Sequence, residues 1–268
     1  MILQSYSQKI MLRIKLIDKK DITVLKAFCE NEILGTKIIC QINAYGLEKD
    51  FLSVWCCIDE KDKIYAVLSK FESNVTLIAN DDFDLSDIRT FLDMISFESL
   101  CCSFNLSQKL GYNITSNKNG YVYCGIYNDE KAENLSEDFY RKSYSLISKS
   151  IPDSFVESEE AYLHFLSDFT YRKRRGLARI KGYAENGTVL SCALTSAETD
   201  NSAIISGVAC DVGCRSTGLG KKTVLSLADE LKSEGKSVFV IALNERAESF
   251  YEHIGFCFKE KISFIERK

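Results

Sequence analysis

The sequence predicts a protein that mixes α-helices and β-strands, of class α+β (α/β mixed), and its C-terminal third predicts this most clearly. Residues 203–210 form an apolar run, and residues 224–231 then repeat apolar side chains at helical spacing. A second apolar run at 238–243 leads into another helical pattern at 244–254. Strand, turn, helix, strand and helix in this order are typical of an α/β unit.

Length and composition allow one large or two small domains. The chain has 268 residues, 46% of them hydrophobic, which is enough for packed cores. The net charge of −4 gives no reason to expect binding to nucleic acid or to a membrane surface. No apolar run approaches the roughly 20 residues of a membrane helix, and residues 1–20 lack the layout of a secretory signal.

The eleven cysteines predict buried thiols. Cys56 and Cys57, and likewise Cys101 and Cys102, would point to opposite faces of a strand, so neither pair suits a local disulfide. No CxxC pair has zinc-site spacing, and the chain has two histidines. We therefore expect no metal site and a cytoplasmic, reducing location.

The first half of the chain alternates strands with helices. A strand near residues 12–16 precedes a helix that begins close to Asp21, a residue type that caps helices. Later strands are marked by alternating or short apolar runs, and helices by apolar spacing of three and four. The further expected elements are strands at 52–57, 64–69 and 75–79, a helix at 85–95, a strand at 98–104, a short helix at 106–110 and a strand at 121–126.

The second half begins after a polar stretch at 128–136, which we expect to be a linker. The dipeptide formed by Asn186 and Gly187 is a strong hairpin signal. The expected elements are helices at 137–148 and 158–170, followed by hairpin strands at 179–185 and 188–195.

Two glycines, Gly218 and Gly220, lie where an expected strand passes into an expected helix. Glycine lets backbone N–H groups approach a ligand closely. The first N–H groups of a helix lack internal partners and carry partial positive charge, so the turn predicts a phosphate site. It is not a P-loop, because no Gly-Lys-Ser/Thr ends it, and the dinucleotide fingerprint needs a third glycine.

Two ordered motifs resemble those of the GNAT N-acetyltransferases. The turn reads Arg215-x-x-Gly218-x-Gly220, similar to the acyl-CoA pyrophosphate loop of that family. Residues 244–256 read Asn-x-x-Ala-x-x-Phe-Tyr-x-x-x-Gly-Phe, which resembles its second motif. The chain also resembles the FR47-like branch. Val212 is a departure, since many members have proline at this position.

The resemblance implies acetyl-CoA as co-substrate. Backbone groups of Val208, Ala209 and Cys210 would pair with the pantetheine amides as an added strand. Asn244 either caps its helix or hydrogen-bonds the coenzyme. The residues that the resemblance assigns to the pyrophosphate loop are Arg215, Ser216, Thr217, Gly218, Leu219, Gly220 and Lys221.

Acyl transfer from a thioester to an amine needs no enzyme nucleophile. By resemblance Tyr251 protonates the leaving thiolate, since the reference pKa of a phenol, about 10, suits that task; the alternative is a core aromatic residue. The candidates for the general base are Glu198, Asp211 and a chain of water molecules, and both carboxylates also fit exposed turns. His164 and His253 are expected on helix surfaces or in packing.

The helices at 137–148 and 158–170 resemble the two family helices that border the acyl-acceptor site. The basic run at 171–175 predicts a solvated loop, and the alternative is contact with coenzyme phosphates or an acidic acceptor. We expect an acetyl-CoA-dependent N-acetyltransferase that acts on a primary amine of a small molecule, without nucleic-acid or membrane partners; a homodimer is left open. The alternatives are a non-catalytic acyl-CoA sensor or scaffold, and an N-acyltransferase that uses another acyl-CoA, as glycine acyltransferases do.

The order of elements echoes between the two halves. Helix, strand, helix and strand surround Leu-Gly-Tyr at 110–112 and Ile-Gly-Phe at 254–256. The first copy lacks the glycine loop, and Ser107 stands where the second copy has its motif tyrosine. We therefore expect a degenerate GNAT-like domain at 1–127 without a coenzyme loop and a catalytic GNAT domain at 128–268, each with a mixed sheet flanked by helices. The alternative is an unrelated α+β domain in the first half.

Overall fold

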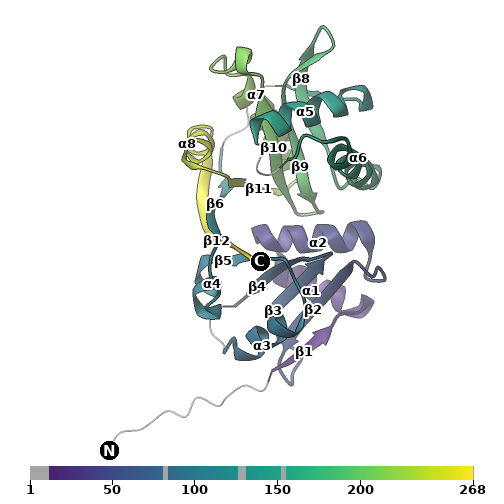
Figure 1. Cartoon of the computed structure of the whole chain (residues 1–268), viewed down its shortest axis with the longest axis vertical. Helices are drawn as coiled ribbons and strands as arrows, with labels where there is room; N and C mark the ends of the chain where they lie inside the picture. The colour runs from purple at the N-terminus through teal and green to yellow at the C-terminus, as the bar shows by residue number, and fades with distance from the viewer. Residues whose placement is uncertain (1–11, 81–83, 126–130, 152–154, 268) are drawn as a thin grey trace, which may run out of the picture. The chain divides into compact units, whose positions relative to one another are not determined.

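The computed structural model describes residues 12–80, 84–125, 131–151 and 155–267 (Figure 1). Its contacts divide the chain into two compact units. The first comprises residues 1–28, 47–117 and 263–268, and the second comprises residues 29–46 and 118–262. In the described residues no helix is both long and apolar enough to cross a membrane.

This division differs from the expected domains, 1–127 and 128–268. Strand β6 (Ser116–Tyr123) pairs along β11 (Ser237–Ala242), which belongs to the second unit. Helix α2 (Ile33–Tyr45), which periodicity did not predict, also joins the second unit. It packs on β9 and β10, and its Thr36 hydroxyl donates to Ser202 at 2.8 Å. Local patterns show that an element forms, but not which sheet it joins.

The first unit is built on an antiparallel sheet with one parallel pair, β4 with β5. Its strands follow the order β1-β2-β3-β4-β5, and the end of β12 (Phe256–Glu266) lies next to β5. The core includes Leu68, Leu77, Ile88 and Leu92. The other elements are β1 (Arg13–Leu16), α1 (Ile22–Cys29), β2 (Leu52–Ile58), β3 (Ile64–Phe71), β4 (Asn74–Ala79), α3 (Ser86–Met94), β5 (Ser99–Ser103) and α4 (Phe104–Leu110).

The second unit has a mixed sheet in the order β12-β6-β11-β10-β9-β8-β7. The pair β10 with β11 is parallel, which requires a crossover connection, and α7 supplies it. The elements are β7 (Glu133–Asn134), α5 (Tyr140–Ser150), α6 (Glu159–Arg174), β8 (Ile180–Glu185), β9 (Thr188–Glu198), β10 (Ser202–Cys210), α7 (Leu219–Ser233), β11, α8 (Glu245–His253) and β12.

Helices cover both faces of this second sheet (Figure 1). On β9, Ala193 packs in the core that contains α7 and α8, whereas its neighbours Cys192 and Leu194 pack with α5 and α6. Adjacent residues on a strand point to opposite faces, so the sheet is buried on both sides.

Most of the expected strands and helices are confirmed, including the hairpin turn, where Asn186 and Gly187 both have positive φ, 49° and 74°. The expected loop at 171–175 is wrong, because α6 continues to Arg174 and Arg172 is buried. Asp168, one helical turn before Arg172, forms an ion pair with it, and this pairing allows the guanidinium group of Arg172 to be buried. Residues 128–130 of the expected linker lie outside the described residues. Seven of the eleven cysteines are buried, and Cys124 and Cys257 are exposed.

Candidate coenzyme site and active site

Strand β10 contains a bulge that opens one of its edges. Ser206 lies opposite Leu194 and Ala209 opposite Cys192, so Gly207 and Val208 together face one residue of β9. Gly207 adopts φ +55°, a conformation that favours glycine. The parallel ladder to β11 runs from Ser202 to Ile205 in the described residues. Beyond Ile205, backbone groups of β10 are available to an added strand.

The loop after β10 has the geometry of an anion site. Ser216 and Gly218 both have positive φ, 64° and 85°, and Gly218 is the N-cap residue of α7. The first helical hydrogen bond to the loop is donated by Lys222 N to Gly218 O at 3.0 Å. The N–H groups of the turn before Lys222 therefore have no carbonyl partner within the helix. A Cβ atom built on Gly218 meets nothing within 4 Å, so this side of the loop faces open space.

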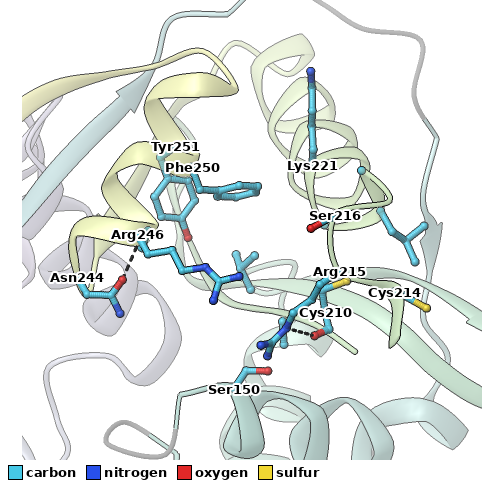
Figure 2. A pocket seen from close by; sticks show the side chains of 16 residues that line it. Ser150, Cys210, Cys214, Arg215, Ser216, Lys221, Asn244, Arg246, Phe250 and Tyr251 are labelled. Carbon is cyan, nitrogen blue, oxygen red and sulfur yellow. Dashed lines mark hydrogen bonds between the residues drawn. The ribbon is translucent and has the colours of Figure 1, made fainter. Parts of the chain in front are cut away.

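A cavity of about 500 Å³ lies between the edge of β10, this loop and α8 (Figure 2). The structure brings together eleven of the thirteen residues that the sequence assigned to the site, and the other two, Thr217 and Glu198, do not line the cavity. The Thr217 hydroxyl instead donates to Cys214 O at 2.7 Å. The lining residues are Ser150, Val208, Ala209, Cys210, Cys214, Arg215, Ser216, Gly218, Leu219, Gly220, Lys221, Asn244, Arg246, Ala247, Phe250 and Tyr251.

The Tyr251 ring lies in the wall of this cavity. It packs against Phe250 and Phe256, with ring centroids 5.3 and 5.5 Å away. Figure 2 shows its hydroxyl pointing into the cavity, and no hydrogen bond to another described residue occupies that hydroxyl. Burial raises the pKa of Tyr251 well above that of an ordinary phenol. The side chain is therefore a protonated hydrogen-bond donor that points into the cavity.

Asn244 caps α8, as one of its two expected roles required. Its side-chain oxygen accepts a hydrogen bond from Ala247 N at 3.0 Å. The same residue lines the cavity, so the start of α8 faces the ligand space.

Sequence reasoning missed Arg246, whose guanidinium points into the cavity from the first turn of α8 (Figure 2). A cation there opposes the positive end of the helix dipole. That unfavourable position was a usable signal, because an anionic ligand would compensate for it. Ser150 and Cys214 were also missed, and Ala247 and Phe250 were part of the second motif but had no site role assigned to them.

Glu198 is not brought to the cavity. It ends β9 opposite Ala203, at the start of β10, so at roughly 3.3 Å per residue it lies about 17 Å along the strand from Val208. Its side chain is fully buried and pairs with Lys236 at 2.6 Å and with Arg179. The expectation of Glu198 as general base is therefore corrected. A buried carboxylate held by two cations is a structural ion pair.

Asp211, the other carboxylate candidate, also does not line the cavity. Its side chain accepts a hydrogen bond from Gly213 N at 2.9 Å and so caps the short turn that leads into the loop. It shapes the loop and does not face the ligand space.

A second cavity, of about 640 Å³, lies between α5, α6 and the strands β9 and β10; we call it the α6 cavity. Ser206 of β10 lines the α6 cavity, and Val208 of the same strand lines the first one, so both adjoin the bulge at Gly207. His164, expected on a helix surface, lies at this second cavity. The lining residues are Tyr144, Phe155, Val156, Ser158, Glu160, Ala161, His164, Phe165, Asp168, Arg172, Leu194, Ser196 and Ser206.

A bulged strand that parts from its parallel neighbour beside a glycine-capped helix offers hydrogen-bonding groups that suit an extended ligand with an anionic part. Residues 136–256 match the model of the acetyltransferase (GNAT) family. This stretch is less than half of the chain, and it resembles the GNAT acetyltransferases, a family of acyl-CoA-dependent transferases. No curated protein sequence matches the chain.

Solved structures share the fold over nearly the whole chain. A GNAT-family acetyltransferase from Colwellia psychrerythraea matches with a TM-score of 0.61 and 14% identity, over 96% of this chain and 100% of that one. A tandem GNAT protein from the clavulanic acid biosynthesis pathway matches at 0.60 and 11%, over 95% and 97%. A GCN5-related N-acetyltransferase from Sphaerobacter thermophilus matches at 0.61 and 11%, over 94% of each. At such identities the likeness shows the fold alone, including the two-domain arrangement.

Proposed function

We propose that this protein transfers the acetyl group of acetyl-CoA to a primary amine of a small molecule by direct attack of the amine on the thioester. One observation supports this most: a single cavity unites the open edge of β10, the N-terminus of α7 and the Tyr251 hydroxyl. These three features match the three parts of the co-substrate: pantetheine amides, pyrophosphate and departing sulfur.

The coenzyme would be held mostly by backbone groups. Its pantetheine amides would pair with β10 from Val208 to Cys210, and its pyrophosphate would accept from the N–H groups of the loop before Lys222. Arg215, Lys221 and Arg246 would add positive charge around the phosphates. The open space at Gly218 fits this assignment, because a side chain there would occupy the phosphate position.

In the reaction, the ammonium group of the acceptor first loses a proton. The neutral nitrogen attacks the thioester carbon, a C–N bond forms, and the C–S bond breaks as the tetrahedral intermediate collapses. Tyr251 gives its phenol proton to the departing thiolate and recovers a proton from the acetylated nitrogen. The net products are an amide, free coenzyme A and one proton. We assign no protein base, because Glu198 and Asp211 are engaged elsewhere.

The α6 cavity would hold the acceptor, since it and the coenzyme cavity are lined by residues on either side of the bulge at Gly207. The test is a thiol-release assay with acetyl-CoA across amines, amino acids and polyamines, combined with calorimetric titration of acetyl-CoA. Binding with thiol release for at least one amine supports the proposal. Binding without release for any amine would favour the sensor or scaffold.

The identity of the acyl group is tested in the same assay by replacing acetyl-CoA with longer acyl-CoA esters. A preference for one of these would favour the glycine-acyltransferase-like alternative over acetyl transfer. Affiliation with the FR47-like branch stays a prediction.

A further inference from the structure

The α6 cavity has an aromatic wall. The rings of Tyr144, Phe155 and Phe165 all contact one another, with centroid distances of 5.9, 5.1 and 6.4 Å. Leu194 adds an aliphatic surface from β9, and Val156 lines the cavity with 65% of its surface exposed. Exposed apolar side chains around a concave aromatic surface favour an apolar occupant, because burying both removes apolar area from water.

Several polar side chains that line this cavity already have partners within the protein. The Tyr144 hydroxyl donates to Val156 O at 2.7 Å, and the Ser158 hydroxyl accepts from Ala161 N at 3.1 Å. Arg172 donates to the Asp168 carboxylate at 2.6 Å and to Ser196 O at 3.0 Å. A polyhydroxylated acceptor would therefore lose hydrogen bonds to water and regain few from the wall.

The charges of the cavity favour one positive charge on the acceptor. Asp168 is paired with Arg172 and also accepts from the Tyr45 hydroxyl. Glu160 is exposed, and among the described residues it takes part in no ion pair. The lining thus contains one carboxylate without a matching cation. It would attract an ammonium group on entry and repel a carboxylate.

We propose that the acceptor is a monoamine with an aromatic or bulky apolar body, an arylalkylamine in chemical class, whose ammonium group is its only charge. This inference rests on the proposed function for the transfer step. The aromatic wall selects the body of the acceptor, Glu160 selects its charge, and the bulge of β10 places its nitrogen beside the thioester.

The experiment measures kcat/KM of the full chain with acetyl-CoA and four acceptors. 2-Phenylethylamine has the proposed features, phenylalanine adds a carboxylate, spermidine lacks the apolar body, and glucosamine replaces it with hydroxyls. We expect 2-phenylethylamine to exceed each of the others by about 10-fold or more, as one lost charge or ring contact implies. If any of the other three is used better, the inference is overturned while acetyl transfer stands.

Variants of α6 test the residues. Phe165→Ala should raise the KM for 2-phenylethylamine about 10-fold and leave the KM for acetyl-CoA unchanged. Phe165→Leu keeps most of the side-chain volume and should raise this KM less. It keeps the test valid if Phe165→Ala fails to fold. Leu163→Ala is the matched control, because Leu163 lies on the same helix, is 52% exposed and does not line the cavity. Equal effects of Phe165→Ala and Leu163→Ala would overturn the role of the wall.

Charge is tested with Glu160→Gln, which should raise the KM for 2-phenylethylamine by about 2-fold to 5-fold, an effect that salt should abolish. Calorimetric titration of 2-phenylethylamine without acetyl-CoA separates the two proposals. Amine binding that Phe165→Ala weakens, in a protein that shows no turnover, would support the acceptor class and overturn the transfer. Turnover of other amines with no binding of 2-phenylethylamine would support acetyl transfer and overturn the proposed acceptor class.

Discussion

The carboxylate of Glu198 lies 2.6 Å from the ammonium group of Lys236, and Glu198 is fully buried. Arg179 contacts the same carboxylate and also pairs with Glu230 and Glu234. This network joins the end of β9 to the end of α7 and the start of β11. It therefore serves stability, and we expect it to have no direct part in catalysis.

Glu198→Gln should lower the free energy of unfolding by about 1 to 3 kcal/mol, because it weakens two charge-assisted contacts of a buried side chain while Arg179 and Lys236 keep Glu234 as a partner. Acetyl-CoA affinity and turnover of the folded fraction should change less than about 2-fold. Chemical denaturation and calorimetry measure the two effects. A protein of unchanged stability that had lost turnover would instead restore Glu198 as a catalytic residue.

Gly218→Val should weaken acetyl-CoA binding by at least about 100-fold, since the new side chain fills the phosphate position and strains a backbone at positive φ. Gly235→Val is the matched control. Gly235 follows α7 at its other end with a similar φ, 83° against 85°, and in both a Cβ meets nothing within 4 Å. Strain is therefore alike in the two variants, and only Gly218 faces the cavity. Equal affinity losses would contradict the pyrophosphate assignment.

Tyr251→Phe should lower kcat by about 10²-fold to 10⁴-fold, the range of general acid catalysis, with little change in acetyl-CoA affinity. Because burial raises the pKa of Tyr251, the donor stays protonated through the alkaline range. The wild-type rate should therefore rise with pH as the acceptor amine loses its proton, without a decline near pH 9. Turnover of Tyr251→Phe that matches wild type at every pH would leave Tyr251 a packing residue only.

Glu260→Gln should stabilise the protein at neutral pH. One carboxylate oxygen of Glu260 is buried without a hydrogen-bond partner among the described residues, and burial, aided by the charge of Glu32, raises its pKa to about 7. The unfolded chain ionises near pH 4.3. Between about pH 4.5 and pH 7 the folded protein keeps a proton that the unfolded chain has lost, so stability falls as pH rises through this window.

The measurement is chemical denaturation of wild type and Glu260→Gln from pH 5 to pH 8. The difference in free energy of unfolding between the two should grow from pH 5 to pH 7 and then stay constant. A difference that does not depend on pH would show that Glu260 ionises normally in the folded state.

One molecule of acetyl-CoA should bind per chain. The first half has no glycine loop, and at the position of Tyr251 it has Ser107, whose hydroxyl bonds to Ser263 at 2.9 Å. Calorimetric stoichiometry tests this expectation, and Gly218→Val should remove all of the binding heat. Two molecules per chain would show that the first half has kept a coenzyme site.

Local patterns predicted most elements because periodicity and turn residues act within a few residues. Gly111 and Gly255 end their helices with φ of 67° and 99°, as their type and position indicated. The order helix, strand, helix and strand is the same in α3 to β6 as in α7 to β12. Helix α2 escaped prediction because it is buried widely and lacks a clear polar face.

The sequence by itself determined the glycine loop at 215–221 and the motif tyrosine, Tyr251, because both depend on residue types at short, ordered spacings. Only the tertiary structure decided which side chains surround Glu198 and Phe165. Glu198 pairs with Arg179 and Lys236, which are 19 and 38 residues away along the chain. Phe165 joined Tyr144 and Phe155 around a cavity. Contacts between residues that are far apart in the sequence depend on how the elements pack, so the local spacing of residue types does not predict them.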